Sequence, residues 1–117
     1  VMFPMYVKMF LSILFRISKS VNNVNGLFYD CNSLEKIPNN FIIPNNVTEM
    51  SGTFGKCSSL KSTTIYIEGE ISDYYQCFYG VTKNEIKIFG YNEENLKNIA
   101  MTSGGRNGYN VAYELIS

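Results

Sequence analysis

The chain of 117 residues contains no histidine and no tryptophan. Histidine is the usual general base of a nucleophilic triad, so its absence excludes the ordinary Ser-His-Asp and Cys-His arrangements. The acidic residues are scattered, and no spacing places two of them on one helical face beside a nucleophile or a base. We therefore expect a protein that is not an enzyme. A small-molecule-binding or enzymatic domain that uses the scattered carboxylates is the alternative.

Cysteine is scarce, and its pattern fits neither a disulfide framework nor a metal site. The three cysteines are an odd number, and none belongs to a C-x-x-C motif. The residue spacing of a calcium loop is missing as well. The sequence thus predicts no cofactor and no metal. Cys31 and Cys57 are expected to be small hydrophobic residues of the core, with a bridge between them as the alternative.

Neither charge nor hydrophobicity is concentrated in a long run. Ten Lys and Arg residues balance ten Asp and Glu residues, without a run of either sign. This balance argues against nucleic acid and anionic membrane as partners, because both need a basic patch. The most apolar stretch, Val1 to Ile17, is interrupted by Lys8 and Arg16. A span needs about 18 largely uncharged residues, so we expect no membrane span.

Two segments, Val21 to Leu34 and Val47 to Leu60, repeat each other at an offset of 26 residues. In each copy, apolar residues follow at steps of three, four and three, which predicts one stripe of a helix. A more divergent third copy starts at Ile71, 24 residues after Val47. The three stripes are Val21, Val24, Phe28 and Cys31; Val47, Met50, Phe54 and Cys57; and Ile71, Tyr74, Phe78 and Val81. Such units cannot bury their apolar faces alone, so we expect them to stack, with the three phenylalanines in contact.

A β-type run follows each stripe. The runs are Leu34 to Pro38 with Phe41 to Ile43, then Ser62 to Ile67, then Glu85 to Phe89. They are expected to pair as a parallel sheet, with Ile65 beside Ile88. Because successive strand side chains alternate between two faces, Tyr66, Lys87 and Phe89 would then point outward. These three residues are candidates for binding a partner.

Asparagine marks two expected helix starts. Asn46 precedes the second stripe, with Glu49 three residues on, and Asn92 precedes two glutamates. Both arrangements can satisfy free amides at the start of a helix. Residues 92–117 are predicted to form a C-terminal cap, made of a short helix, a glycine-rich loop and a closing strand from Tyr109 to Ile116.

The N-terminal segment, residues 1–20, carries more apolar side chains than one stripe against the next unit can cover. We interpret it as a degenerate first repeat, with a leader as the alternative. Large exposed apolar patches mark interfaces. A protein partner, or a second copy of the chain, is therefore expected to bind at the N-terminal end. The candidate contact residues are Met5, Met9, Phe10 and Leu14.

The stretch from Gly52 to Ser58 superficially suggests a phosphate loop. The Walker pattern requires four residues between its glycines and a Ser or Thr directly after its lysine. Neither condition is met, and Lys56 is expected on the solvent side of a repeat helix. We therefore expect no nucleotide site.

One phrase of the sequence has a family counterpart. The residues from Asn46 to Leu60, Asn-Val-Thr-x-Met-Ser-x-x-Phe-x-x-Cys-Ser-Ser-Leu, resemble the BspA-like class of leucine-rich repeats. A looser copy ends in Phe28 to Leu34, and Cys77 to Gly80 is an eroded third copy. The resemblance covers about Val21 to Phe89.

The resemblance implies an α/β repeat fold. The expected form is a short right-handed solenoid, with a parallel sheet on one face and helices on the other. Residues 1–117 would form one domain, with repeat units at 21–46, 47–70 and 71–91.

The resemblance also implies a function. Repeats of this class serve adhesion or protein binding, and they occur in bacterial surface proteins, in some protists and in bacteriophage structural proteins. We therefore expect a non-enzymatic binding or assembly module in a virion or at an extracellular or cell surface, with a host-surface ligand as a further candidate partner. The brevity of the chain favours a virion component, and a fragment of a longer adhesin is the alternative.

Overall fold

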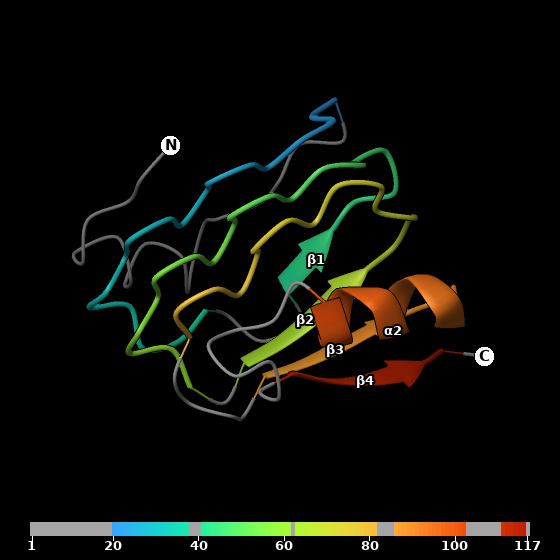
Figure 1. Cartoon of the computed structure of the whole chain (residues 1–117). Coiled ribbons are helices and arrows are strands. Elements are labelled where there is room, and N and C mark those ends of the chain that lie inside the picture. Colours follow the sequence, from blue (N-terminus) through green and yellow to red (C-terminus); the bar gives the residue numbers. More distant parts are fainter. Residues whose placement is uncertain (1–19, 38–40, 62, 82–85, 103–110, 117) are drawn as a thin grey trace.

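The computed structural model describes residues 20–37, 41–61, 63–81, 86–102 and 111–116. In this part of the chain, four strands form one parallel sheet and one helix follows the third strand (Figure 1). The elements are β1 (Phe41–Ile43), β2 (Thr63–Ile67), β3 (Ile86–Gly90), α2 (Glu93–Thr102) and β4 (Val111–Leu115). The protein thus has a small α/β fold. Each strand lies in a run that the sequence predicts to be extended, whereas Leu34 to Ile37 is irregular.

The strands pair in the order β1-β2-β3-β4, and Ile65 lies opposite Ile88, as predicted. Buried and partly exposed side chains alternate along β2 and β3. Their buried isoleucines are Ile65, Ile67, Ile86 and Ile88. At the end of β3, a Cβ on Gly90 would lie 2.9 Å from the Ile67 carbonyl oxygen and 3.0 Å from Leu96 Cδ2. The absence of a side chain at Gly90 therefore lets α2 pack closely over the sheet.

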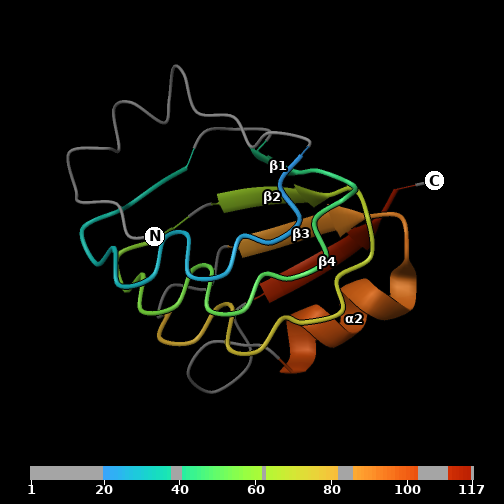
Figure 2. The ribbon, with the colours of Figure 1, turned by 90° about the horizontal axis from the view of Figure 1, so that it is seen from above.

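The three apolar stripes do not form helices. Residues 25–30, 51–56 and 75–80 run as consecutive turns, and the two ribbon views show these segments side by side (Figures 1 and 2). The prediction of helices along the stripes, including a helix start at Asn46, is therefore wrong. We call these three stretches the turn segments.

Backbone hydrogen bonds explain the difference. In a helix, each amide bonds to the carbonyl four residues back. In the turn segments, alternate amides bond to the next segment instead, as Phe28 N does with Thr53 O at 2.8 Å. The intervening amides close short turns, as Leu27 N does with Val24 O at 3.1 Å. The donors to the next segment are Val24, Gly26, Phe28 and Asp30, and then Met50, Gly52, Phe54 and Lys56.

Left-handed residues interrupt any helix in these segments. Gly26 has a φ of 65° and Asp30, four residues on, has a φ of 62°. Each occupies the third position of a turn, where a positive φ suits glycine best and asparagine or aspartate next. The same two places are taken by Gly52 and Lys56 in the second segment, and by Gln76 and Gly80 in the third. The backbone thus follows the same course three times.

The core lies between the turn segments and the sheet. Phe54 stacks on Phe28, with ring centres 5.4 Å apart, and on Phe78, with ring centres 5.5 Å apart. The predicted contact of the three phenylalanines is therefore confirmed. The cysteines are free and buried, as expected for small hydrophobic residues. Burial raises the pKa of Cys57 to about 12, and its thiol donates a hydrogen bond to the Phe28 carbonyl at 3.0 Å.

Helix α2 begins where the sequence predicts. Asn95 N donates to Asn92 Oδ1 at 2.9 Å, which confirms Asn92 as the capping residue. The side chain of Asn95 then turns to Ile71. Its Oδ1 accepts from Ile71 N at 2.9 Å, and its Nδ2 donates to Ile71 O at 2.8 Å. These two bonds tie α2 to the chain that enters the third turn segment.

Two predictions concern parts of the chain outside the described residues. These are the degenerate repeat or leader at residues 1–19 and the glycine-rich loop within 103–110. Among the described helical residues, none belongs to a helix with the length and apolar character that a membrane span requires.

Candidate interaction surface

One row of side chains crosses all four described strands on the outer face of the sheet. The strand register pairs Ile42 with Tyr66, Tyr66 with Phe89, and Phe89 with Glu114. We call these four residues the outer row. Neighbouring strands lie about 4.8 Å apart, so the row spans roughly 14 Å. Sequence reasoning found its two aromatic members, and it missed Ile42 and Glu114 because their place depends on the register.

The two aromatic rings of the outer row support each other. Tyr66 and Phe89 are stacked, with ring centres 5.0 Å apart and an angle of 17° between the rings. Both side chains are half-buried. Such stacked pairs contribute about 0.5–1.5 kcal/mol beyond the area they bury. The rings therefore form a fixed apolar ridge that costs little side-chain entropy when a partner binds.

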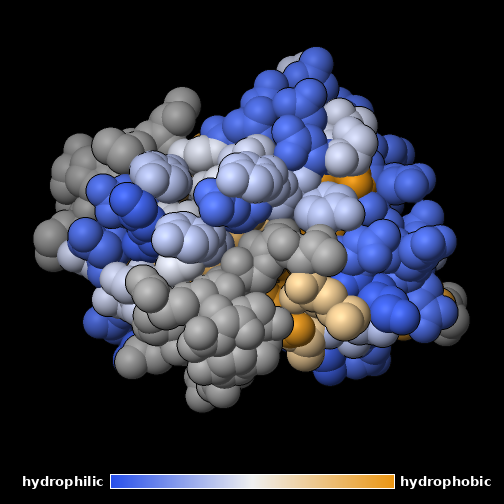
Figure 3. Space-filling view, in the orientation of Figure 1, coloured by the Kyte–Doolittle hydropathy of each residue, from blue (hydrophilic) through white to orange (hydrophobic). Residues whose placement is uncertain are grey.

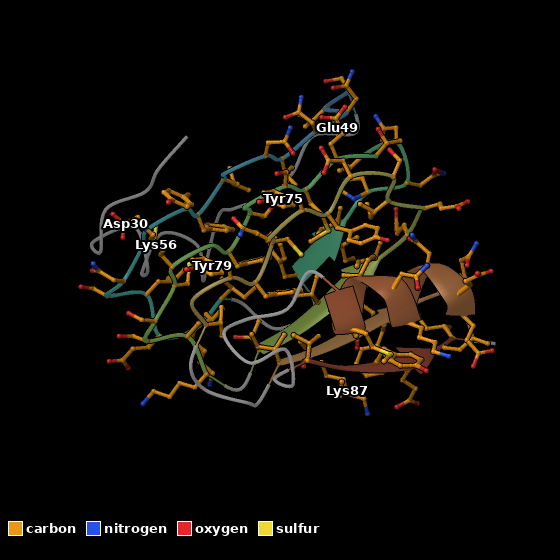
Figure 4. The ribbon with its side chains drawn as sticks, viewed as in Figure 1. Asp30, Glu49, Lys56, Tyr75, Tyr79 and Lys87 are labelled. Carbon is orange, nitrogen blue, oxygen red and sulfur yellow. The ribbon has the colours of Figure 1, made fainter. Side chains whose placement is uncertain are left out.

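Lys87 stands beside this ridge, as the predicted strand alternation requires. Its Nζ lies 5.1 Å from the centre of the Phe89 ring and 2.7 Å from Glu114 Oε1. The ion pair is accessible, with 44% of the Lys87 side chain and 56% of the Glu114 side chain exposed. Figure 4 shows Lys87 projecting on the side of the sheet away from the turn segments. The structure thus brings Tyr66, Lys87 and Phe89 together as one surface.

The other predicted contact residues cannot be placed. Met5, Met9, Phe10 and Leu14 all lie outside the described residues. Their role at the N-terminal end therefore stays a prediction from the sequence.

A second group of aromatic side chains lies on the turn segments. Tyr29, Tyr75 and Tyr79 are exposed, and Lys56 Nζ lies 5.6 Å from the centre of the Tyr29 ring. A hydrogen bond with Tyr29 raises the pKa of Lys56, so its ammonium stays charged. Figure 4 shows Asp30, Lys56 and Tyr79 at the same end of these segments. The exposed face in Figure 3 is largely hydrophilic, with apolar atoms confined to a small area.

Sequence reasoning missed the turn-segment tyrosines, although a signal existed. Tyr29 and Tyr79 take the same place in the first and third segments, and Gly55 takes that place in the second. The Tyr29 ring lies over this glycine, since a Cβ on Gly55 would be 2.9 Å from Tyr29 Cδ1. A tyrosine–glycine–tyrosine column is thus readable once the offsets are known.

The chemistry open to the described residues is limited. The amides of Gly52, Phe54 and Lys56 are engaged with carbonyls of the third segment, so they cannot cradle a phosphate. Lys56 itself lies in a turn and not on a helix. Within the described ranges, no three His, Cys, Asp or Glu side chains are grouped in a way that could hold a metal ion.

Comparison with known proteins adds no relative. No protein-family model, curated protein or solved structure matches this chain.

Proposed function

We propose that the protein is a non-enzymatic module that binds a protein partner through the outer face of its sheet. The observation that carries this proposal is the outer row, in which two stacked aromatic rings lie between Ile42 and Glu114 on neighbouring strands. Aromatic side chains that lose little entropy on binding are typical centres of protein interfaces.

We further propose that the chain is a short solenoid of BspA-like repeats. Three features support this proposal: the offsets of 26 and 24 residues, the turns that recur in three segments, and the stacking of the three phenylalanines. Each repeat would then consist of a turn segment and a strand, in place of a helix and a strand. Solenoids of this kind bind partners through extended, rigid surfaces.

The setting in which the module acts follows from the resemblance alone. We propose a place in a virion or at an extracellular or cell surface, where the module joins neighbouring proteins or contacts a host surface. The N-terminal residues Met5, Met9, Phe10 and Leu14 would supply the main assembly contact, and the outer row would supply a second one.

Site-specific photocrosslinking in the native cell or particle tests the binding surface. A benzoylphenylalanine in place of Tyr66 or Phe89 should give one adduct of defined mass with a partner chain. The same group in place of Tyr75, which is 68% exposed on the turn segments, is the matched control and should give none. Equal labelling at all three positions, or none at Tyr66 and Phe89, would contradict the proposal.

A further inference from the structure

The ion pair beside the aromatic ridge has the composition of a cation-binding site that is already filled from within. We propose that the partner inserts an arginine side chain between Phe89 and Glu114 and takes the place of Lys87. This inference rests on the proposed function, since it names the chemistry of the partner at the outer row.

The register fixes the two walls of this site. Strand β3 lies between β2 and β4, so Tyr66 and Glu114 lie on opposite sides of Phe89. Tyr66 covers one face of the Phe89 ring. The ammonium of Lys87, held at 2.7 Å by Glu114, lies over the ring on the β4 side. The place that Lys87 fills therefore offers an aromatic face and a carboxylate together.

Lys87 holds this place weakly. Exposed ion pairs and exposed cation–π contacts each contribute little, because water competes for the charges. Both partners of the pair are about half exposed. The long, flexible stem of lysine also lets the ammonium move out into solvent without any change in the backbone.

A guanidinium suits the two walls better than an ammonium. It is planar and can stack on the Phe89 ring while it donates two parallel hydrogen bonds to a carboxylate. Lys87 makes one short contact, to Glu114 Oε1. An arginine from a partner can therefore form a second hydrogen bond to the carboxylate and add a stacking contact that lysine lacks.

The remainder of the outer row indicates a protein and not a free small cation. Ile42 lies at the opposite end of the row from Glu114 and is 44% exposed. The partner surface should thus present an arginine and an apolar side chain roughly 14 Å apart, the span of three strand spacings.

Titration with an arginine derivative tests the site. The probe is N-acetyl-arginine methylamide, and binding is followed through the NMR amide signals of Phe89 and Glu114. In Lys87→Met the internal ammonium is gone, so the probe should bind about fivefold more tightly than to the unchanged protein. Lys97→Met removes an exposed charge on α2 and should leave the affinity unchanged. N-acetyl-citrulline methylamide, which is neutral, should not bind.

The decisive variant is the double change Lys87→Met with Glu114→Gln, which should lose the gained affinity. The proposal is overturned if Lys87→Met binds no more tightly, or if citrulline or the double variant binds as well as arginine does. If these results occur while crosslinks form at Tyr66 and Phe89, the outer row is a binding surface without an arginine site. Tight arginine binding without any crosslink would instead contradict the proposed function alone.

Discussion

Cys57 is the residue whose chemistry the fold changes most clearly. Its thiol is fully buried and donates to the Phe28 carbonyl, and desolvation raises its pKa from 9.0 to about 12. Between these two pH values, the folded chain keeps a proton that the unfolded chain loses. Stability due to this group is therefore complete below pH 9 and falls as pH rises toward 12.

The pH dependence of unfolding by urea measures this effect. Replacement by alanine removes the titrating thiol, so the stability advantage of the unchanged protein over Cys57→Ala should shrink by about 1.4 kcal/mol per pH unit above about pH 9. Tyrosine and lysine titrate in the same range, but they affect both proteins alike. Parallel pH profiles for the two proteins would show that Cys57 is not buried as described.

Gly55 is required by the ring that lies over it. A Cβ at this position would meet Tyr29 Cδ1 at 2.9 Å and Tyr29 Cε1 at 3.1 Å. We expect Gly55→Ala to lower the free energy of unfolding by about 1–2 kcal/mol, as overpacking does elsewhere. In a Tyr29→Ala background most of that loss should disappear. A loss of the same size in both backgrounds would place its cause in the backbone.

At the scale of the elements, the sequence predicts strands better than it predicts the turn segments. Alternation of isoleucine with exposed residues is specific to a strand that is buried on one face, and β2 and β3 follow it. Apolar steps of three, four and three fit a helix, but they fit consecutive turns equally well. Gly26, Gly52 and Gly80 carry the positive φ that distinguishes the two, and periodicity does not register it.

Asn95 is the residue on which the attachment of α2 depends. Its amide group satisfies both backbone groups of Ile71, which is buried. Asn95→Ala leaves an amide and a carbonyl buried without partners, so we expect a loss of about 2–4 kcal/mol in unfolding free energy. Lys97→Ala, at an exposed position of the same helix, should change it by less than about 0.5 kcal/mol. Equal effects in chemical denaturation would contradict the described pairing.

At the scale of the whole molecule, the parallel sheet and the contact of the phenylalanines could be predicted because both depend on the offsets between copies. The outer row was predicted only in part, since Ile42 and Glu114 join it through strand register. Lys56 was assigned to a helix because the turn chemistry at Gly52 was not recognised. Residues 1–19 carry predicted contacts that lie outside the described part of the chain.

The N-terminal contact makes a prediction at this scale. An aspartate in place of Met9 or Phe10 would bring a charge into the expected apolar interface, which is costly without a partner charge. We expect each variant to give a soluble monomer that no longer assembles, as measured by sedimentation velocity over a range of concentrations. If residues 1–20 can be removed and assembly persists, the segment is not the contact.

Three equivalent turn segments, joined by hydrogen bonds between neighbours, hold the sheet and its outer row in place. Scalar couplings across hydrogen bonds, measured by NMR, identify each donor and acceptor directly and so test this central feature. We predict couplings from Gly26 N to the Ser51 carbonyl, from Phe28 N to the Thr53 carbonyl, and from Phe54 N to the Cys77 carbonyl. Couplings from Phe28 N to the Val24 carbonyl, as in a helix, would contradict it.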